Sequence, residues 1–270
     1  MTTGVTHAVL GHGRLAQALV PALRATGVAV VIGRRTPGAG EQSHADAVQA
    51  ADWVWLTVPD DYIAIVAAAL PWQPHQLALH CSGATPLSAL QPAPAAAGFH
   101  PLKLLAGGPV LAGAHVGIEA GEAHRPALWA LAVQLGLQPL ALPSPMSATA
   151  RAAYHAAANL AASGVLAVLA EAGALWSAAG LAGDALPALL PLTRGALDTA
   201  AARGLPGAVS GPIARGDTGV LQRHLQALAD AGLEADLLRA LGLRQLALAE
   251  AAGRLNVAQV TALRKALQAG

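Results

Sequence analysis

The stretch Val9-Leu-Gly-His-Gly-Arg-Leu-Ala16 lies close to the start of the 270-residue chain and contains the spacing G-x-G-x-x-A. A short apolar run, His7 to Leu10, precedes it and predicts a strand, and residues 14–25 predict a helix. A strand, a glycine turn and a helix in this order begin the βαβ units of open α/β folds. This stretch therefore predicts that the first half of the chain folds around a mostly parallel sheet.

The same turn predicts a dinucleotide site. Gly11 permits the tight turn, Gly13 lets the backbone approach a pyrophosphate, and the small Ala16 lets helix and strand pack closely. The N–H groups at the start of the helix suit phosphate oxygens. An ordinary turn is the alternative in a chain so rich in glycine and alanine. We assign cofactor contacts to the whole turn, namely to Gly11, His12, Gly13, Arg14, Leu15 and Ala16.

The end of the second predicted strand, 28–32, indicates which dinucleotide binds. NAD sites carry an acidic residue there for the ribose 2′-hydroxyl, whereas this chain has Arg34 and Arg35 and no acid before Glu41. Two guanidinium groups suit a 2′-phosphate, which they bind by charge-assisted hydrogen bonds. The sequence therefore predicts NADP(H), with a solvated basic turn as the alternative. The next strand end is expected to contact the cofactor through Thr57, Val58 and Pro59.

Strands and helices alternate in the first half of the chain, and helices alone fill the second. Further strands are predicted at 53–57, 77–81, near Gly98, 115–118 and 137–142, with helices at 125–135 and at 61–70, the latter capped by Asp60. Beyond Pro145 the candidate helices are 147–179, 184–202, 217–231, 233–252 and 256–268. We expect an α/β domain with a doubly wound sheet over 1–146 and an all-α domain over 147–270.

Composition excludes several classes of protein. Charged residues make up 11% of the chain, against about 25% on average, and hydrophobic residues 54%, while Phe, Trp and Tyr together reach only 3%. The apolar material is mostly small, which favours closely packed helices over an all-β sandwich. A net charge of +1 argues against a nucleic-acid binder. The single cysteine, Cys81, and the absence of a signal-peptide pattern predict a cytoplasmic protein without an internal disulfide.

Residues 152–170 raise a membrane alternative. They include no Asp, Glu, Lys or Arg and are numerous enough to span a bilayer. Several polar residues lie among the alanines, however, and no cluster of Lys and Arg flanks the stretch. We therefore expect a helix buried between two layers of protein, and no membrane partner.

Six short motifs along the chain resemble those of a known family: GHGRLA at 11–16, LTVPDD at 56–61, HCSGA at 80–84, FHPL at 99–102, YHAAAN at 154–159 and SGPIARGD at 210–217. The chain resembles an uncharacterised family of Rossmann-like proteins with a C-terminal domain of unknown function. That family is related to pyrroline-5-carboxylate reductase, deazaflavin-dependent NADP oxidoreductases and β-hydroxyacid dehydrogenases. The resemblance implies an NADP-binding Rossmann domain, a helical domain of the 6-phosphogluconate dehydrogenase C-terminal type and a homodimer formed through the helices, but no known substrate.

His155 and Asn159 lie four residues apart, so on a helix they share one face. In the similar β-hydroxyacid dehydrogenases a K-x-x-x-N pair faces the nicotinamide, and the resemblance gives His155 the place of the lysine. An imidazole, whose pKa in water is about 6.5, is able to protonate a carbonyl or imine during hydride transfer, while Asn159 orients the substrate. The alternative is a buried histidine with a structural role only.

Four other residues are candidates for contacting a substrate. Ser82 and Gly83 follow a predicted strand and are expected at the ligand edge of the sheet. His100 lies near the next strand end, and a catalytic role and a purely structural role are its alternatives. Arg215 lies in a Gly/Pro turn and is suited to clamping a carboxylate or phosphate. Pairing with Asp217, which is expected to cap the following helix, is the structural alternative for this arginine.

The ten histidines are scattered, without the spacings H-x-x-x-H or C-x-x-C that metal sites favour. We predict no metal, and a site built from His80, His100 and His155 is the alternative.

The overall expectation is an NADP(H)-dependent oxidoreductase that acts on a small carbonyl, imine or hydroxy substrate in a cleft between the domains. Its rival is a non-catalytic protein that senses NADP(H) or a metabolite.

Overall fold

The computed structural model describes residues 4–269 and contains two compact units, which divide between Ser163 and Gly164. The boundary expected from the sequence, after residue 146, lies earlier along the chain. The difference comes from one helix, α5 (Ala148–Asn159), which belongs with the sheet because Arg151 and Tyr154 tie it to strand residues.

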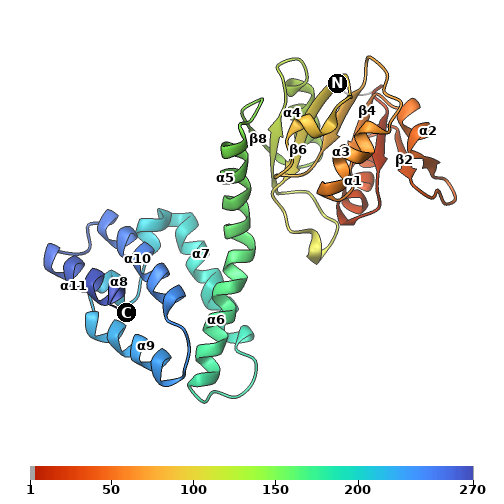
Figure 1. Cartoon of the computed structure of the whole chain (residues 1–270). Coiled ribbons are helices and arrows are strands. Elements are labelled where there is room, and N and C mark those ends of the chain that lie inside the picture. The colour runs from red at the N-terminus through yellow and green to blue at the C-terminus, as the bar shows by residue number, and fades with distance from the viewer. Residues whose placement is uncertain (1–3, 270) are drawn as a thin grey trace. The chain divides into compact units, whose positions relative to one another are not determined.

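The first unit is built on one eight-stranded sheet with the order β3-β2-β1-β4-β5-β6-β7-β8 (Figure 1). Its strands are β1 (His7–Leu10), β2 (Val30–Arg34), β3 (Gln42–Ser43), β4 (Trp53–Leu56), β5 (Leu77–His80), β6 (Ala95–Pro101), β7 (His115–Glu119) and β8 (Gln138–Ala141). Neighbouring strands pair in parallel, except that β6 and β7 are antiparallel. The strand order reverses at β1 and β4, where open α/β folds bind ligands. The predicted mostly parallel, doubly wound sheet is confirmed.

Helices cover both faces of this sheet. On one face the core lies between the strands and the helices α1 (Arg14–Ala25) and α4 (Arg125–Gln134). On the other face it lies between the strands and the helices α2 (His44–Gln49) and α3 (Asp60–Ala68). Strand residues alternate between the two cores, so that Trp55 joins the core of α1 and its neighbour Val54 that of α3. Burial on both faces explains why these strands are continuous apolar runs in the sequence.

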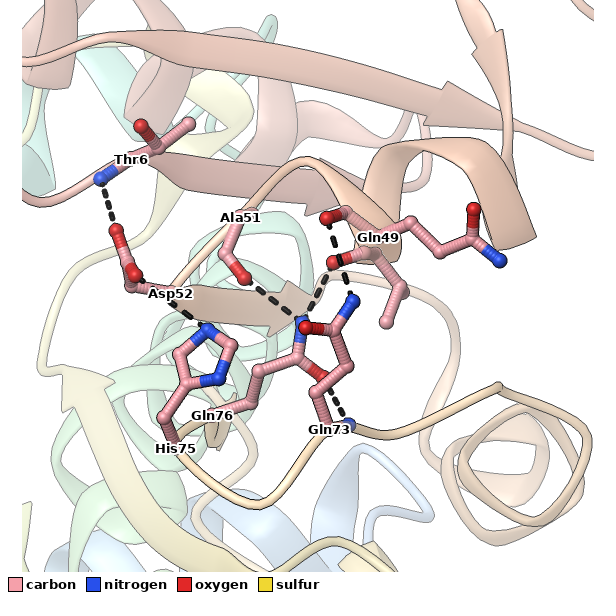
Figure 2. Close-up of polar contacts among 8 residues, drawn as sticks. Thr6, Gln49, Ala51, Asp52, Gln73, His75 and Gln76 are labelled. Atoms are coloured by element: carbon pink, nitrogen blue, oxygen red, sulfur yellow. Dashed lines mark hydrogen bonds and ion pairs between the residues drawn. The ribbon is translucent and has the colours of Figure 1, made fainter.

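A polar network fastens the amino ends of three strands (Figure 2). Asp52, just before β4, accepts a hydrogen bond from the Thr6 amide at 2.8 Å and lies 3.6 Å from the Nε2 atom of His75. The buried side-chain amide of Gln76, just before β5, donates to the Ala51 carbonyl at 2.7 Å. The network holds the amino edge of the sheet, opposite to the edge at which ligands of this fold bind.

The second unit is helical, as predicted. It contains α6 (Val165–Ala178), α7 (Leu186–Ala208), α8 (Pro212–Arg215), α9 (Thr218–Asp230), α10 (Asp236–Ala251) and α11 (Val257–Gln268). Its buried core is small and comes from the later helices, through Ile213, Leu221, Leu246, Leu263 and Leu267. No residue of α6 or α7 is buried. These two apolar helices therefore have an uncovered surface within the chain.

The long helix predicted for 147–179 forms, but it is not buried. α5, the π-helical turn Leu160–Gly164 and α6 follow one another directly. By length and composition the segment Ala148–Ala178 is able to cross a membrane, with a mean hydropathy of 1.5, and 6% of its most apolar window is buried. The expectation of a helix buried between two layers of protein is therefore wrong for the single chain. Only Arg151 is buried along α5, so the chain provides no second layer over the apolar residues.

Candidate functional site

The turn after β1 has a shape that only glycine allows at its first position. Gly11 has a φ of +127°, and a Cβ atom there would lie 2.8 Å from both the carbonyl oxygen and Oγ1 of Thr57. Thr57 is held in place because its hydroxyl donates to the Leu10 carbonyl at 2.8 Å. Gly13 is the N-cap of α1 and gives the helix no side-chain cap, and the first turn has no acidic residue. The N–H groups at the start of α1 therefore suit an anionic ligand.

A cavity of about 880 Å³ adjoins this turn, within the range of roughly 300 to 1,000 Å³ that is typical of ligand pockets. It is lined by most of the residues predicted to contact a cofactor: Gly11, His12, Gly13, Arg14, Leu15, Arg34, Arg35, Thr57, Val58 and Pro59. Ala16 does not line it but is buried against the sheet, as close packing requires. Sequence reasoning missed His44, Tyr62 and the segment 103–106, which also line the cavity. None of the described lining residues is acidic.

The two arginines after β2 differ in their partners. The Nε atom of Arg34 donates to Oε1 of Glu41 at 2.8 Å, and its Nη2 lies 2.6 Å from the same oxygen. The Gly38 amide, together with Arg34, holds the pKa of the Glu41 carboxyl below its usual value. Burial, and to a lesser degree the charge of Arg35, lowers the pKa of His44. Among the residues described, Arg35 forms no ion pair, so its guanidinium is available to an added anion.

A second cavity, of about 430 Å³, lies within the first unit between the end of β6 and α5. Three predicted site residues line it, His100, His155 and Asn159. The π-helical turn contributes part of the wall, and such turns are frequent at functional sites. Residues 103 and 104 line both cavities, so the two adjoin at this segment. The spacing of four residues does place His155 and Asn159 on one side of α5, as predicted.

Tyr154 is a residue that sequence reasoning missed. Its hydroxyl lies 2.9 Å from Nδ1 of His100, and the two rings meet edge to face with centroids 5.6 Å apart. Gly117 makes room for this hydroxyl, because a Cβ atom there would lie 2.5 Å from it. Burial, and secondarily the charge of His155, lowers the pKa of His100, while burial raises the pKa of Tyr154. Burial therefore favours the neutral form of both groups, and one of them donates the hydrogen bond that joins them.

A buried ion pair fixes α5 to the sheet. Nη2 of Arg151 lies 2.5 Å from Oε2 of Glu119, and the two side chains are 7% and 2% exposed. The other oxygen of Glu119 accepts a hydrogen bond from the Met146 amide at 2.8 Å. Arg151 precedes Tyr154 and His155 by three and four residues, so all three lie on neighbouring positions of one helix face. The ion pair therefore holds the face of α5 that carries both of these side chains.

Ser82 is occupied by contacts with its own loop and with the start of α3. Its hydroxyl donates to Oδ2 of Asp60 at 2.6 Å and accepts hydrogen bonds from the Ala84 and Thr85 amides. The prediction that Asp60 caps α3 is wrong, because the helix begins at Asp60 itself, with Pro59 at the N-cap, and the carboxylate is bound to Ser82 instead. Ser82 lines neither cavity, and its contact with a substrate stays a prediction.

Three residues next to Ser82, at the end of β5 and just after it, are buried inside the first unit: His80, Cys81 and Gly83. Gly83 lies against His100, since a Cβ atom there would be 2.7 Å from the Cε1 of that ring. Cys81 is buried, and burial raises the pKa of its thiol to about 12. Burial lowers the pKa of His80 to about 4. Within residues 4–269 no group of three or more His, Cys, Asp or Glu side chains is placed to hold a metal ion.

Arg215 belongs to α8 in the helical unit. Its side chain is exposed, and its carbonyl accepts a hydrogen bond from Gln259 at 3.4 Å. Asp217 caps α9, as predicted, by accepting a hydrogen bond from the Val220 amide at 2.9 Å. In the part of the chain that the structure describes, Arg215 and Asp217 form no ion pair, and the contact of Arg215 with a substrate stays a prediction.

Comparison with known proteins identifies the fold. Residues 114–245 match the model of a family described as a domain of unknown function, DUF2520. No curated protein matches the sequence. Protein TM1727 from Thermotoga maritima is 21% identical, with a TM-score of 0.70 over 92% of this chain and 100% of that one.

Two enzymes solved with a nicotinamide cofactor have the same fold. A reductive aminase from Aspergillus terreus, in complex with NADPH and ethyl-5-oxohexanoate, is 19% identical, with a TM-score of 0.65 over 96% of this chain and 98% of that one. An imine reductase variant from Myxococcus stipitatus, in complex with NAD⁺, is 16% identical, with a TM-score of 0.63 over 96% of this chain and 99% of that one. The predicted resemblance to Rossmann-like proteins with a C-terminal domain of unknown function is confirmed, and the chain has the two-domain fold of these reductases.

Proposed function

We propose that this protein is a cytoplasmic NADP(H)-dependent oxidoreductase that transfers a hydride to or from a small carbonyl, imine or hydroxy compound. The observation that carries the proposal is the pair of adjoining cavities. One lies over the glycine turn and the start of α1, and the other is lined by His100, His155 and Asn159. The related fold of enzymes solved with NADPH or NAD⁺ supports the choice of cofactor.

The first cavity fits a dinucleotide. The absence of a side chain at Gly11 and the uncapped N-terminus of α1 suit a pyrophosphate. Arg35 and His44 offer hydrogen-bond donors for a 2′-phosphate, and Arg34 lines the same cavity in the orientation that Glu41 gives it. No acidic residue lines this cavity in the described part of the chain, which favours the additional phosphate of NADP(H) over the 2′-hydroxyl of NAD(H).

A nicotinamide cofactor supplies hydride transfer at C4 of its ring. Reduction of a carbonyl places that hydride on carbon and one proton on oxygen, and the products are an alcohol and NADP⁺. The protein positions the reactants and delivers the proton. We assign the proton to a ring nitrogen of His155 and the orientation of the substrate to Asn159. His100, held by the Tyr154 hydroxyl, is the second imidazole that contacts the substrate.

The test is consumption of NADPH with a panel of aldehydes, ketones and imines. We expect at least one compound to be reduced, and His155→Ala to lower kcat by about 10²- to 10⁴-fold without changing the affinity for NADPH. His115→Ala is the matched control, because that histidine is exposed at the start of β7 and lines neither cavity. An unchanged rate in His155→Ala would remove this residue from catalysis. Tight binding of NADPH with no turnover across the panel would favour the alternative, a non-catalytic protein that senses NADP(H) or a metabolite.

We further propose that a second copy of the chain covers α6 and α7. Neither helix has a buried residue, and Leu166, Leu192 and Leu197 are 61%, 72% and 58% exposed. Apolar surface of this extent marks an interaction site in a soluble protein, and twofold homodimers are the commonest assemblies. The helical unit has a small core of its own, so burial of this surface would also stabilise it.

Light scattering after size exclusion tests the dimer. We expect twice the chain mass of 26.9 kDa for the wild type and a shift to monomer for Leu192→Glu. Ile65→Glu is the control, because Ile65 is 64% exposed on α3 in the other unit. A wild-type monomer would contradict the proposal, and recovery of the wild type in the membrane fraction would support the membrane alternative.

A further inference from the structure

Lys103 lies where the two cavities adjoin. The chain has two lysines, and Lys103, in the segment after β6, lines both cavities. Its Nζ atom donates to the Ala112 carbonyl at 3.3 Å and, among the described residues, forms no ion pair. An ammonium group has three donors, so two of them are available to a ligand.

The second cavity has a positive charge and no negative one. The other polar residues that line it are His100, His155, Asn159 and Ser163, and among the residues that the structure describes no acidic one lines it. Asp60 acts on His100 electrostatically but does not line the cavity, and its carboxylate already accepts the Ser82 hydroxyl. Burial favours the neutral form of His100. Among the described residues that line this cavity, Lys103 is the only lysine or arginine.

The remaining lining residues are apolar and small or medium in size: Pro101, Leu102, Leu104, Ala158, Ala161 and Ala162. One ammonium group beside an apolar wall suits a ligand with a single negative charge and a hydrocarbon part. A phosphate ester, with about two charges near pH 7, would call for a second cation, and no other lysine or arginine within the described part of the chain lines the cavity.

We propose that the substrate carries a carboxylate that Lys103 binds, and that its apolar part lies against the alanines of α5 and the π-helical turn. This inference rests on the proposed function and names its substrate class, the 2-oxo acids and the corresponding imines. Because Lys103 is at the junction of the cavities, the bound carboxylate lies beside the carbon that accepts the hydride. Reduction then gives a 2-hydroxy acid, or a 2-amino acid from an imine, together with NADP⁺.

Calorimetric titration of the whole protein with phenylpyruvate and with its methyl ester, in the presence of NADP⁺, tests the carboxylate directly. We expect the acid to bind more tightly than the ester. Lys103→Met should lower the affinity for the acid by about 10- to 100-fold and leave the affinity for the ester unchanged. Lys265→Met is the matched control, since Lys265 lies in α11 of the other unit. Lys103→Arg should retain the binding, which separates loss of the charge from loss of the fold.

The titration needs no turnover, so its result is independent of the proposed reaction. Equal affinity for acid and ester, an unchanged affinity in Lys103→Met or no binding of the acid to any form overturns the role of Lys103. Reduction of neutral ketones alone, with no binding of the acid, would support the oxidoreductase and overturn the carboxylate. Binding of the acid through Lys103 without NADPH oxidation would support the anion site and contradict the proposed function.

Discussion

Replacing Arg151 by methionine leaves Glu119 as a buried carboxylate without its partner. The side chains of Glu119 and Arg151 are 2% and 7% exposed, so water does not take the place of the guanidinium. Removal of one partner of a buried ion pair costs about 3–5 kcal/mol. In a unit of this size each kcal/mol lowers Tm by about 2–4 °C, which gives a fall of about 6–20 °C.

Differential scanning calorimetry of the whole protein measures this loss, with two matched variants. Arg264→Met breaks the exposed pair of Arg264 and Glu250, whose side chains are 48% and 37% exposed, and should cost no more than about 1 kcal/mol. The double variant Glu119→Leu/Arg151→Met removes both charges and should recover a large part of the stability. A Tm of Arg151→Met equal to that of Arg264→Met, or a double variant as unstable as the single one, would show that the buried ion pair does not hold α5 on the sheet.

Three other perturbations test the glycine turn, the hydrogen bond between Tyr154 and His100, and the buried His80. Gly11→Ala should abolish NADPH binding in calorimetry, because its Cβ atom would lie 2.8 Å from Thr57, and wild-type affinity would contradict the shape of the turn. Tyr154→Phe removes the hydrogen bond to His100 and should shift the pH profile of kcat, whereas His115→Ala, at an exposed residue that lines neither cavity, should not. Burial lowers the pKa of His80 from 6.5 to about 4. The unfolded chain therefore binds a proton first, and stability should fall by about 3 kcal/mol as the pH falls from 6.5 to about 4. Urea unfolding across this range tests the loss, which His80→Leu should abolish.

The start of the fold was predictable because its signals are local. β1 and α1 have the predicted bounds, since an apolar strand, a glycine turn and a helix are encoded by adjacent residues. The conformation of Gly11, with φ at +127°, is of the kind that the motif requires. The short β3 and α2 were not predicted. A strand of two residues, such as β3, is too short to show periodicity in the sequence.

The parts of the site that sequence reasoning missed depend on contacts between distant segments. Tyr154 and His100 are separated by 54 residues, and only the register of α5 on the sheet brings them together. The pairing of Arg34 with Glu41 likewise depends on the path of the loop between them. The exposure of α6 was missed for another reason, since composition reports how apolar a helix is but not whether its own chain covers it.

In our proposal the cavity over the glycine turn binds NADP(H) through its basic wall. Calorimetric titration of the wild type, Arg34→Ala and Arg35→Ala with NADPH and NADH measures this binding. We expect the wild type to prefer NADPH by about tenfold or more, and Arg35→Ala to lose this preference while its affinity for NADH is unchanged. Failure of the wild type to bind either dinucleotide would show that this cavity is not a cofactor site.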